Sequence, residues 1–313
     1  MKIFDCVDLR DKMEECITKY TERSVELGLG RPYLTVISVG EDGASNSYVK
    51  SKENACARTG VMFYHMTLNK ETTQEWLIKK VNEVNNNKLV DGLIVQFPID
   101  SYRTISDEAV LNAISPNKDV DGLTPVSMGR LASNTNPVFI PCTAKGVVDI
   151  LTKQLQMDLV GKHVVIIGKG KTSGRPLSLL LPNYGATVST IDSKTKEGIR
   201  QHLLDSADIV ISCTGRPNSV DVQQICQLKP VTLINIGMDR VNGKLVGDID
   251  LNSFKDYEEK FKYDLDIQAN TLTKSTGLMT VTNLLYNTCV AHLLKNVPPQ
   301  HFKELSDILK ELY

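Results

Sequence analysis

The chain has 313 residues, of which 41% are hydrophobic and 23% charged, and its 36 basic residues nearly balance its 37 acidic ones. At roughly 150 residues per domain, this length favours two domains over one. A net charge of −1 offers no broad field for a polyanion, which argues against a nucleic-acid or membrane-surface partner. No apolar run reaches the roughly 18 residues of a membrane span, and the N-terminus lacks the order of a signal peptide. We therefore expect a cytoplasmic protein.

The cysteines and histidines show no spacing typical of a metal site or a local nucleophile. The seven cysteines are an odd number without C-x-x-C spacing, which favours reduced and mostly buried thiols. The five histidines are scattered along the chain. The sequence therefore predicts no metal site.

Strand and helix patterns alternate in the first half of the chain. The predicted strands are 33–39, 61–68 and 91–96, and the predicted helices between them are 44–59 and 73–86. A loop-rich stretch follows at 115–131. Strands separated by helices predict a mostly parallel α/β sheet with helices on both faces.

A second alternating series begins near residue 162. Its predicted strands are 163–167, 187–191, 209–212 and 232–236, with helices from about 174 and near 196–204. Between the two series, Thr143 can cap a helix over 143–156, and this connector is the expected domain boundary. An apolar helix over 279–294 is expected to dock on the protein.

A glycine loop joins the first strand of the second series to its helix. Residues 168–174 read G-x-G-x-x-S-G, in the strand–turn–helix context of a dinucleotide-binding fingerprint. Gly168 permits a tight turn and Gly170 lets the backbone approach a pyrophosphate. Ser173 stands where the third glycine is usual, with Gly174 directly after it. The loop predicts a Rossmann-type domain that binds NAD or NADP.

The residues after the next strand leave the choice of cofactor open. Asp192 ends that strand and suits an acid that binds the ribose hydroxyls of NAD. Lys169 and Lys194 argue for NADP, since either could contact its 2′-phosphate. The acid favours NAD weakly.

Tyr48 and Lys52 lie four residues apart, so a helix places them on one face. A lysine in a partly dry pocket has a lowered pKa and can transfer protons, although a helical lysine is usually solvated. The pair also matches the Tyr-x-x-x-Lys of short-chain dehydrogenases. In those enzymes, however, the glycine loop precedes the pair, which is the reverse of the order here.

The run VGEDGASNSYVKSK at 39–52 resembles the substrate motif of the bifunctional methylenetetrahydrofolate dehydrogenase/cyclohydrolase family. Eight further segments match that family in order and extend the resemblance over nearly the whole chain. They are DGLIVQFP (91–98), PNKDVDGLTP (116–125), PCTAKGV (141–147), GKGKTSGRP (168–176), CTGRP (213–217), NIGMD (235–239), GKLVGDID (243–250) and MTVTNLLYNT (279–288).

The resemblance implies a role for each matching residue. Lys52 would transfer protons in the cyclohydrolase step, Gln96 would hydrogen-bond to Lys52, Tyr48 would lie over the folate rings, and Asp121 would anchor the amino groups of the pterin. The further substrate-binding residues that it implies are Ser45, Pro98 and Gly277. The implied cofactor-binding residues are Gly168, Lys169, Gly170, Ser173, Gly174, Asp192, Ser193, Thr214 and Gly215.

The resemblance also implies an architecture and a reaction. Residues 1–144, completed by helices in 279–313, would form an α/β/α folate domain, and 145–278 a Rossmann domain, with the active site in a cleft between them. The enzyme would oxidise 5,10-methylenetetrahydrofolate with NAD(P)⁺ and hydrolyse the methenyl product to 10-formyltetrahydrofolate, in one-carbon metabolism and purine biosynthesis. A homodimer that takes polyglutamylated folate is expected.

Three segments depart from the family pattern, which keeps two alternatives open. Lys169-Gly170 replaces Arg-Ser, Ala144 replaces a proline, and residues 273–278 replace a Pro-Gly-Gly-Val-Gly-Pro loop. The family as a whole favours NADP, whereas Asp192 resembles its monofunctional NAD-dependent branch, which lacks the lysine that Lys52 supplies. The alternatives are such a monofunctional dehydrogenase, or a non-catalytic relative that binds folate or dinucleotide.

Overall fold

The computed structural model describes residues 1–40, 43–135, 139–220, 222–225, 230–261 and 266–311. The chain divides into two compact units, each made of two segments. Met1–Leu9 and Thr143–Thr280 form one, which we call the six-stranded unit. Arg10–Cys142 and Val281–Tyr313 form the other, the three-stranded unit.

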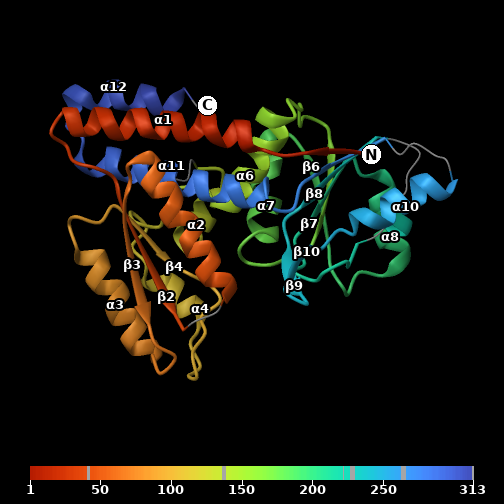
Figure 1. Cartoon of the computed structure of the whole chain (residues 1–313), viewed down its shortest axis with the longest axis horizontal. Coiled ribbons are helices and arrows are strands. Elements are labelled where there is room, and N and C mark those ends of the chain that lie inside the picture. Colours follow the sequence, from red (N-terminus) through yellow and green to blue (C-terminus); the bar gives the residue numbers. More distant parts are fainter. Residues whose placement is uncertain (41–42, 136–138, 221, 226–229, 262–265, 312–313) are drawn as a thin grey trace. The chain divides into compact units, whose positions relative to one another are not determined.

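The six-stranded unit is built on a parallel sheet with the order β1-β11-β8-β7-β5-β6. Strands β6, β7 and β8 of this sheet are labelled in Figure 1. Its strands are β1 Lys2–Phe4, β5 His163–Ile167, β6 Thr187–Ile191, β7 Ile209–Ser212, β8 Val231–Asn235 and β11 Ile267–Asn270. Strands β7 and β8 are buried along their whole length, as is typical of parallel strands covered on both faces. Residues 1–9, assigned by the sequence analysis to the other domain, supply the edge strand β1.

Helices and one hairpin complete this unit. The helices are α6 Cys142–Asp149, α7 Gly174–Leu180, α8 Glu197–Ser206, α9 Val222–Ile225 and α10 Leu251–Phe261, and the hairpin strands are β9 Met238–Val241 and β10 Lys244–Gly247. A π-helix, Ile150–Gln154, continues α6. Phe254 of α10 packs with apolar residues of β5, β7 and β8 in a single buried cluster.

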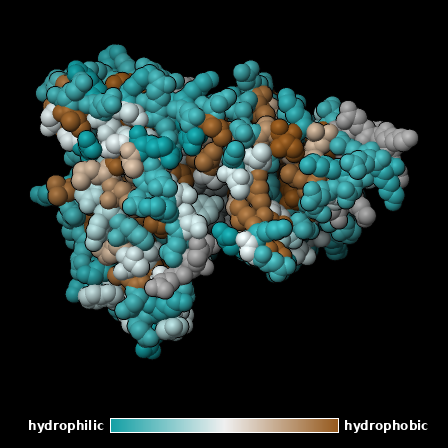
Figure 2. Space-filling model, viewed as in Figure 1, coloured by the Kyte–Doolittle hydropathy of each residue, from teal (hydrophilic) through white to brown (hydrophobic). Residues whose placement is uncertain are grey.

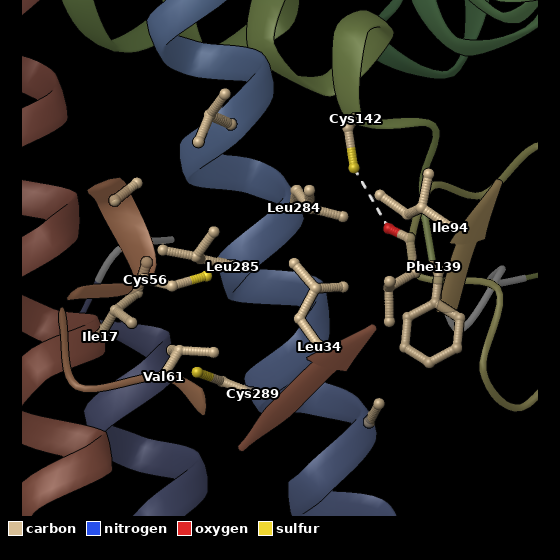
Figure 3. Close-up of a cluster of buried hydrophobic side chains, with 14 of the residues drawn as sticks. Ile17, Leu34, Cys56, Val61, Ile94, Phe139, Cys142, Leu284, Leu285 and Cys289 are labelled. Atoms are coloured by element: carbon tan, nitrogen blue, oxygen red, sulfur yellow. Dashed lines mark hydrogen bonds between the residues drawn. The ribbon is translucent and has the colours of Figure 1, made fainter. Parts of the chain in front are cut away.

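The three-stranded unit has the parallel order β3-β2-β4. Its strands are β2 Tyr33–Val39, β3 Met62–Leu68 and β4 Gly92–Val95, and its helices are α1 Val7–Glu26, α2 Gly43–Thr59, α3 Gln74–Asn86, α4 Asp107–Ala113, α5 Pro125–Ala132, α11 Thr276–Asn296 and α12 Pro299–Lys310. Successive residues of a strand point to opposite faces. Leu34 therefore packs with α2 and α11 (Figure 3), and Val36 belongs to the same cluster. Ile37 and Val39 pack with α3 and α4.

The α/β class and parallel sheets that the sequence predicts are confirmed, and four predicted strands have the observed bounds: 33–39, 163–167, 187–191 and 209–212. The cap at Thr143 is wrong, because α6 begins at Cys142 and Thr143 lies inside it. The loop-rich stretch contains a helix, α5, whose first turn is capped by Thr124 accepting from the Ser127 N–H. Helix α11 begins earlier than predicted, at Thr276.

The described cysteines are all free, and every one except Cys213 is buried, in line with the expected thiols. Within the described ranges no helix has the length and apolarity to cross a membrane. Nor do those ranges contain a group of three His, Cys, Asp or Glu residues arranged to hold a metal ion. Figure 2 shows one face of the molecule, on which hydrophobic residues form small patches among hydrophilic ones.

Candidate functional site

Lys52 lies in the middle of α2 and contacts the residue that follows β4. Its ammonium donates to Gln96 Oε1 at 2.5 Å, and Gln96 Nε2 in turn donates to the Phe97 carbonyl at 2.7 Å. The second bond fixes which end of the amide faces the lysine. Lys52 is only 7% exposed, so burial removes most of the water that a lysine normally binds.

Burial and one carboxylate act on Lys52 in opposite directions. Burial lowers the pKa of Lys52, and the negative charge of Asp121 opposes that shift. Burial likewise raises the pKa of Asp121, against the effect of Lys52. Because desolvation dominates at both groups, the neutral amine of Lys52 forms at a lower pH than in a free lysine.

Tyr48 lies one helical turn before Lys52 and keeps 38% of its surface exposed. An exposed aromatic ring beside a buried lysine offers a face on which a planar ligand can stack. Pro98 is also exposed, two residues after Gln96. The Ser45 side chain, which the sequence analysis assigned to substrate binding, lies outside the described residues.

Two aspartates of the 116–125 motif have different surroundings. The Asp119 carboxylate is buried and accepts from the Leu123 and Thr124 N–H groups and from the Ser127 hydroxyl, at 3.2, 2.9 and 2.6 Å. It shapes the start of α5. Asp121 is half-buried, whereas Asp119 is only 1% exposed.

Three groups that sequence reasoning missed hold the backbone on either side of Asp121. Asn287 Nδ2 on α11 donates to the Val120 carbonyl at 2.8 Å and to that of Ile140 at 3.1 Å. The Cys142 thiol donates to the same Val120 carbonyl at 3.2 Å (Figure 3). Gly122 has φ +72°, and a Cβ there would lie 2.7 Å from the Pro141 nitrogen. Asn287 belongs to the MTVTNLLYNT segment, but only the fold brings its side chain to these carbonyls.

In the six-stranded unit, the glycine loop follows β5 and packs closely on Cys213, the residue directly after β7. Gly168 has φ +111°, and a Cβ there would lie 2.7 Å from the Cys213 carbonyl oxygen. A Cβ at Gly174, the first residue of α7, would lie 2.2 Å from the Gly168 oxygen. Gly170 has nothing within 4 Å of its Cβ position. Its backbone is therefore open to a pyrophosphate, and the loop fits a dinucleotide.

Asp192 follows β6 and forms an ion pair with Lys169. The Lys169 ammonium lies 3.2 Å from Asp192 Oδ2, and the two side chains are 44% and 33% exposed. The Lys194 backbone N–H donates to Asp192 Oδ1 at 2.9 Å. That hydrogen bond and Lys169 lower the pKa of Asp192. The carboxylate is thus ionised and accessible, with Ser193 exposed directly after it.

The remaining expected cofactor residues lie at the same edge of this sheet. Thr214 and Gly215 follow β7, and Ser173 directly precedes α7. Ligands of open α/β sheets bind at the carboxyl ends of parallel strands. The structure therefore gathers Gly168, Lys169, Asp192 and Thr214 at the edge where a dinucleotide would lie.

The altered segment 273–278 turns directly into a helix. Gly277 lies in the first turn of α11. Before it, Asn270 Nδ2 donates to the Ser275 hydroxyl at 2.6 Å and to the Asn235 carbonyl at 3.0 Å. Thr276 donates to the same Asn235 carbonyl at 3.3 Å. Hydrogen bonds among buried polar groups at the ends of β8 and β11 therefore fix the course of segment 273–278.

Family comparisons match both halves of the chain. The catalytic domain of the tetrahydrofolate dehydrogenase/cyclohydrolase family matches residues 4–121, and the NAD(P)-binding domain of the same family matches residues 141–296.

Individual relatives agree with this result. A protein of Aquifex aeolicus called bifunctional protein FolD is 38% identical over 308 residues, which cover 95% of this chain and 99% of the relative. The crystal structure of a bifunctional FolD dehydrogenase/cyclohydrolase from Campylobacter jejuni superposes with a TM-score of 0.83 at 31% identity, over 93% of this chain and 98% of that one. A Trypanosoma brucei FolD, solved with NADP and an inhibitor, gives 0.82 at 29% identity, over 93% and 96%.

Proposed function

Because this chain belongs to the tetrahydrofolate dehydrogenase/cyclohydrolase family, we propose that it catalyses both reactions named by that family. It oxidises 5,10-methylenetetrahydrofolate to the methenyl compound with NAD(P)⁺ and hydrolyses that product to 10-formyltetrahydrofolate. The buried contact between Lys52 and Gln96 carries the second activity in this proposal.

The hydrolytic step needs a proton acceptor that later becomes a donor. As water adds to the methenyl carbon, the neutral Lys52 amine takes a proton from it. The resulting ammonium returns the proton to N5 of the folate as the C–N5 bond breaks. The remaining hydroxyl proton of the adduct is released to solvent as the carbonyl forms, which leaves the formyl group on N10. General acid–base catalysis is most effective when the pKa lies near the working pH. Burial shifts the pKa of Lys52 in that direction.

The other residues of the three-stranded unit bind and orient the folate. The Asp121 carboxylate accepts hydrogen bonds from the pterin amino groups, and the exposed Tyr48 ring stacks on the ring system. Gln96 accepts from Lys52 and so holds the amine in place. Ser45, Pro98 and Gly277 complete the folate contacts in this proposal.

We assign hydride acceptance to a nicotinamide cofactor bound at the six-stranded unit. When bound, the cofactor would supply an acceptor for the hydride of the methylene carbon. Gly168, Gly170, Ser173 and Gly174 would hold its pyrophosphate, while Thr214 and Gly215 would form the neighbouring wall. Asp192 and Ser193 would face the adenosine ribose. Because the Asp192 carboxylate would accept from ribose hydroxyls and repel a 2′-phosphate, we propose NAD⁺ as the preferred cofactor, with Lys169 moderating that preference.

We also propose a homodimer, because the edge of β3 offers a surface for one. In the described part of the chain β3 pairs only with β2, and it exposes Met62 and Tyr64 to 46% and 48%. An exposed apolar edge strand is a surface for pairing with another chain. Light scattering should give twice the mass of one chain, and a monomer at micromolar concentration would refute this point.

The family assignment further supports a polyglutamylated folate, a cytoplasmic enzyme and a product that supplies formyl groups to purine biosynthesis. Folates of increasing glutamate length test the first of these proposals. A KM that falls as glutamates are added is the expected result, and an unchanged KM would contradict it.

One spectrophotometric assay tests the proposed function. The purified chain is given methylenetetrahydrofolate with NAD⁺ and, separately, NADP⁺. We expect reduced nicotinamide from at least NAD⁺, and loss of methenyl absorbance when the methenyl compound is supplied alone. If neither cofactor is reduced at saturating substrate, the dehydrogenase assignment fails. If methenyl hydrolysis does not exceed the uncatalysed rate, the cyclohydrolase assignment fails.

A further inference from the structure

A buried carboxylate in the six-stranded unit belongs to the GKLVGDID segment and is not one of the expected cofactor-binding residues. Asp248 directly follows β10 and is 0% exposed. Its Oδ2 accepts from the Ser212 hydroxyl at 2.9 Å and from the Thr214 backbone N–H at 2.6 Å. Its Oδ1 accepts from the Arg216 backbone N–H at 3.0 Å. A single side chain thus receives three hydrogen bonds from the segment that ends β7 and forms the next turn.

The surroundings of Asp248 fix its position closely. A Cβ at Gly237 would lie 2.1 Å from Asp248 Oδ2, so only glycine leaves room for the carboxylate. The Asp248 N–H donates to the Gly237 carbonyl, and the Asp248 carbonyl accepts from the Val220 N–H, both at 3.0 Å. The backbone of Asp248 is therefore fixed by hydrogen bonds on both sides, which fixes the position of its carboxylate independently of the turn.

The turn that Asp248 holds forms one side of the glycine loop. Cys213, directly before Thr214, donates its N–H to the Ile167 carbonyl at 2.9 Å. The Cys213 carbonyl oxygen leaves no room for a side chain at Gly168, and the Cys213 sulfur would lie 3.1 Å from a Cβ at Gly174. A displacement of Thr214 would therefore also displace the Cys213 atoms that pack on both glycines.

We propose that Asp248 is a positioning residue of the nucleotide site, whose buried carboxylate holds the turn Thr214–Arg216 in the shape that receives the dinucleotide. The proposal rests on the proposed function, because it presumes that a dinucleotide binds this loop. The Thr214 and Arg216 N–H groups point at Asp248, so the carboxylate acts through the shape of the turn. It does not contact the cofactor itself.

Asp248→Asn tests this proposal, because an amide of the same size cannot accept at both ends. Loss of one charged hydrogen bond next to the turn should weaken NADH or NADPH binding about tenfold or more, as measured by the fluorescence of the bound nicotinamide. The Thr214 and Arg216 amide resonances should shift in ¹⁵N spectra. Methenyl hydrolysis should stay within about twofold of wild type, since Lys52 belongs to the three-stranded unit.

Asp250→Asn is the matched control. Asp250 lies two residues further along, and its Oδ1 accepts from the Asn252 and Ser253 N–H groups at the start of α10. This variant should lower the melting temperature without changing nucleotide affinity. A purely structural role of Asp248 would give the same pattern in both variants. Wild-type nucleotide affinity in a folded Asp248→Asn variant would therefore overturn the proposal.

Ser212→Ala covers the case in which Asp248→Asn does not fold. It removes only one of the three donors, and we expect a two- to threefold loss of nucleotide affinity, about half a kcal/mol. An unchanged affinity in this variant would contradict the proposal. A wild-type chain that binds neither reduced nicotinamide would instead refute the dehydrogenase assignment, so the two failures are distinguishable.

Discussion

Each unit places a lysine near an aspartate, but the two environments differ. Lys52 is 7% exposed and its pKa is lowered by burial, with Asp121 opposing the shift. The Lys169 side chain is 44% exposed and forms a 3.2 Å ion pair with Asp192. Desolvation changes how strongly a group holds its proton, whereas an exposed ion pair contributes little energy and opens readily. The buried lysine is thus suited to proton transfer and the exposed pair to reversible recognition of a ligand.

The largest expected effect follows from removing the buried amine. Lys52→Met should reduce methenyl hydrolysis by roughly 10²–10⁴-fold, the usual contribution of a general acid–base group. Hydride transfer should survive in part, because it needs positioning and no proton transfer from Lys52. Both rates are measured on the same preparation. Lys50→Met is the control, because Lys50 lies exposed on the same helix and forms an ion pair with Glu53. Wild-type hydrolysis in Lys52→Met would remove the assigned role.

Asp121→Asn should weaken folate binding in both reactions. Loss of the carboxylate acceptor should raise the folate KM about tenfold or more. It should also move the acid limb of the hydrolysis profile to lower pH, because the Asp121 charge raises the pKa of Lys52. Rates measured across the pH range give both quantities. A folate KM equal to that of wild type would argue against pterin contact.

Asp119→Asn separates a structural aspartate from its neighbour in the same motif. The amide cannot accept all three hydrogen bonds that Asp119 receives, so we expect a loss of about 2–4 kcal/mol in the free energy of unfolding. Urea titration measures it. Asp107→Asn, at an exposed position in the first turn of α4, should cost less than about 1 kcal/mol. If the two losses were equal, the Asp119 network would not stabilise the fold.

The smallest effect is expected at the exposed pair. Asp192→Asn should raise the KM for NAD⁺ and lower that for NADP⁺, each by less than about tenfold, because solvent and salt screen this site. The ratio of the two KM values, measured at low and high salt, reports the change. A ratio that moves towards NAD⁺ would contradict the role given to Asp192.

Local patterns predicted the parts of both sites that lie close together in sequence. The glycine loop could be read because a strand, two glycines and a helix follow one another, and four-residue spacing placed Tyr48 beside Lys52. The contact between Lys52 and Gln96 spans 44 residues. The spacing of residues in the sequence could not predict this contact, and only the family resemblance predicted it.

Contacts over longer sequence distances were missed. Asn287 reaches a carbonyl 167 residues away, and Asp248 reaches Thr214 across 34 residues and a hairpin. Residues 1–9 join a sheet whose partner strand begins at Ile267. Strand β1 has only three residues, so it carries too little hydrophobic pattern to indicate its partner. Such contacts depend on the order of strands in the sheet, which local periodicity does not encode.

The proposed hydrolysis depends most directly on the protonation of one amine. The Lys52 Nζ can be titrated by NMR in protein labelled with ¹⁵N-lysine, with its resonance assigned by its absence from Lys52→Met. We predict a midpoint below the ordinary lysine value of 10.5, with hydrolysis rising over the same pH range. A Lys52 midpoint at or above 10.5 would contradict the claim that burial prepares this lysine for proton transfer.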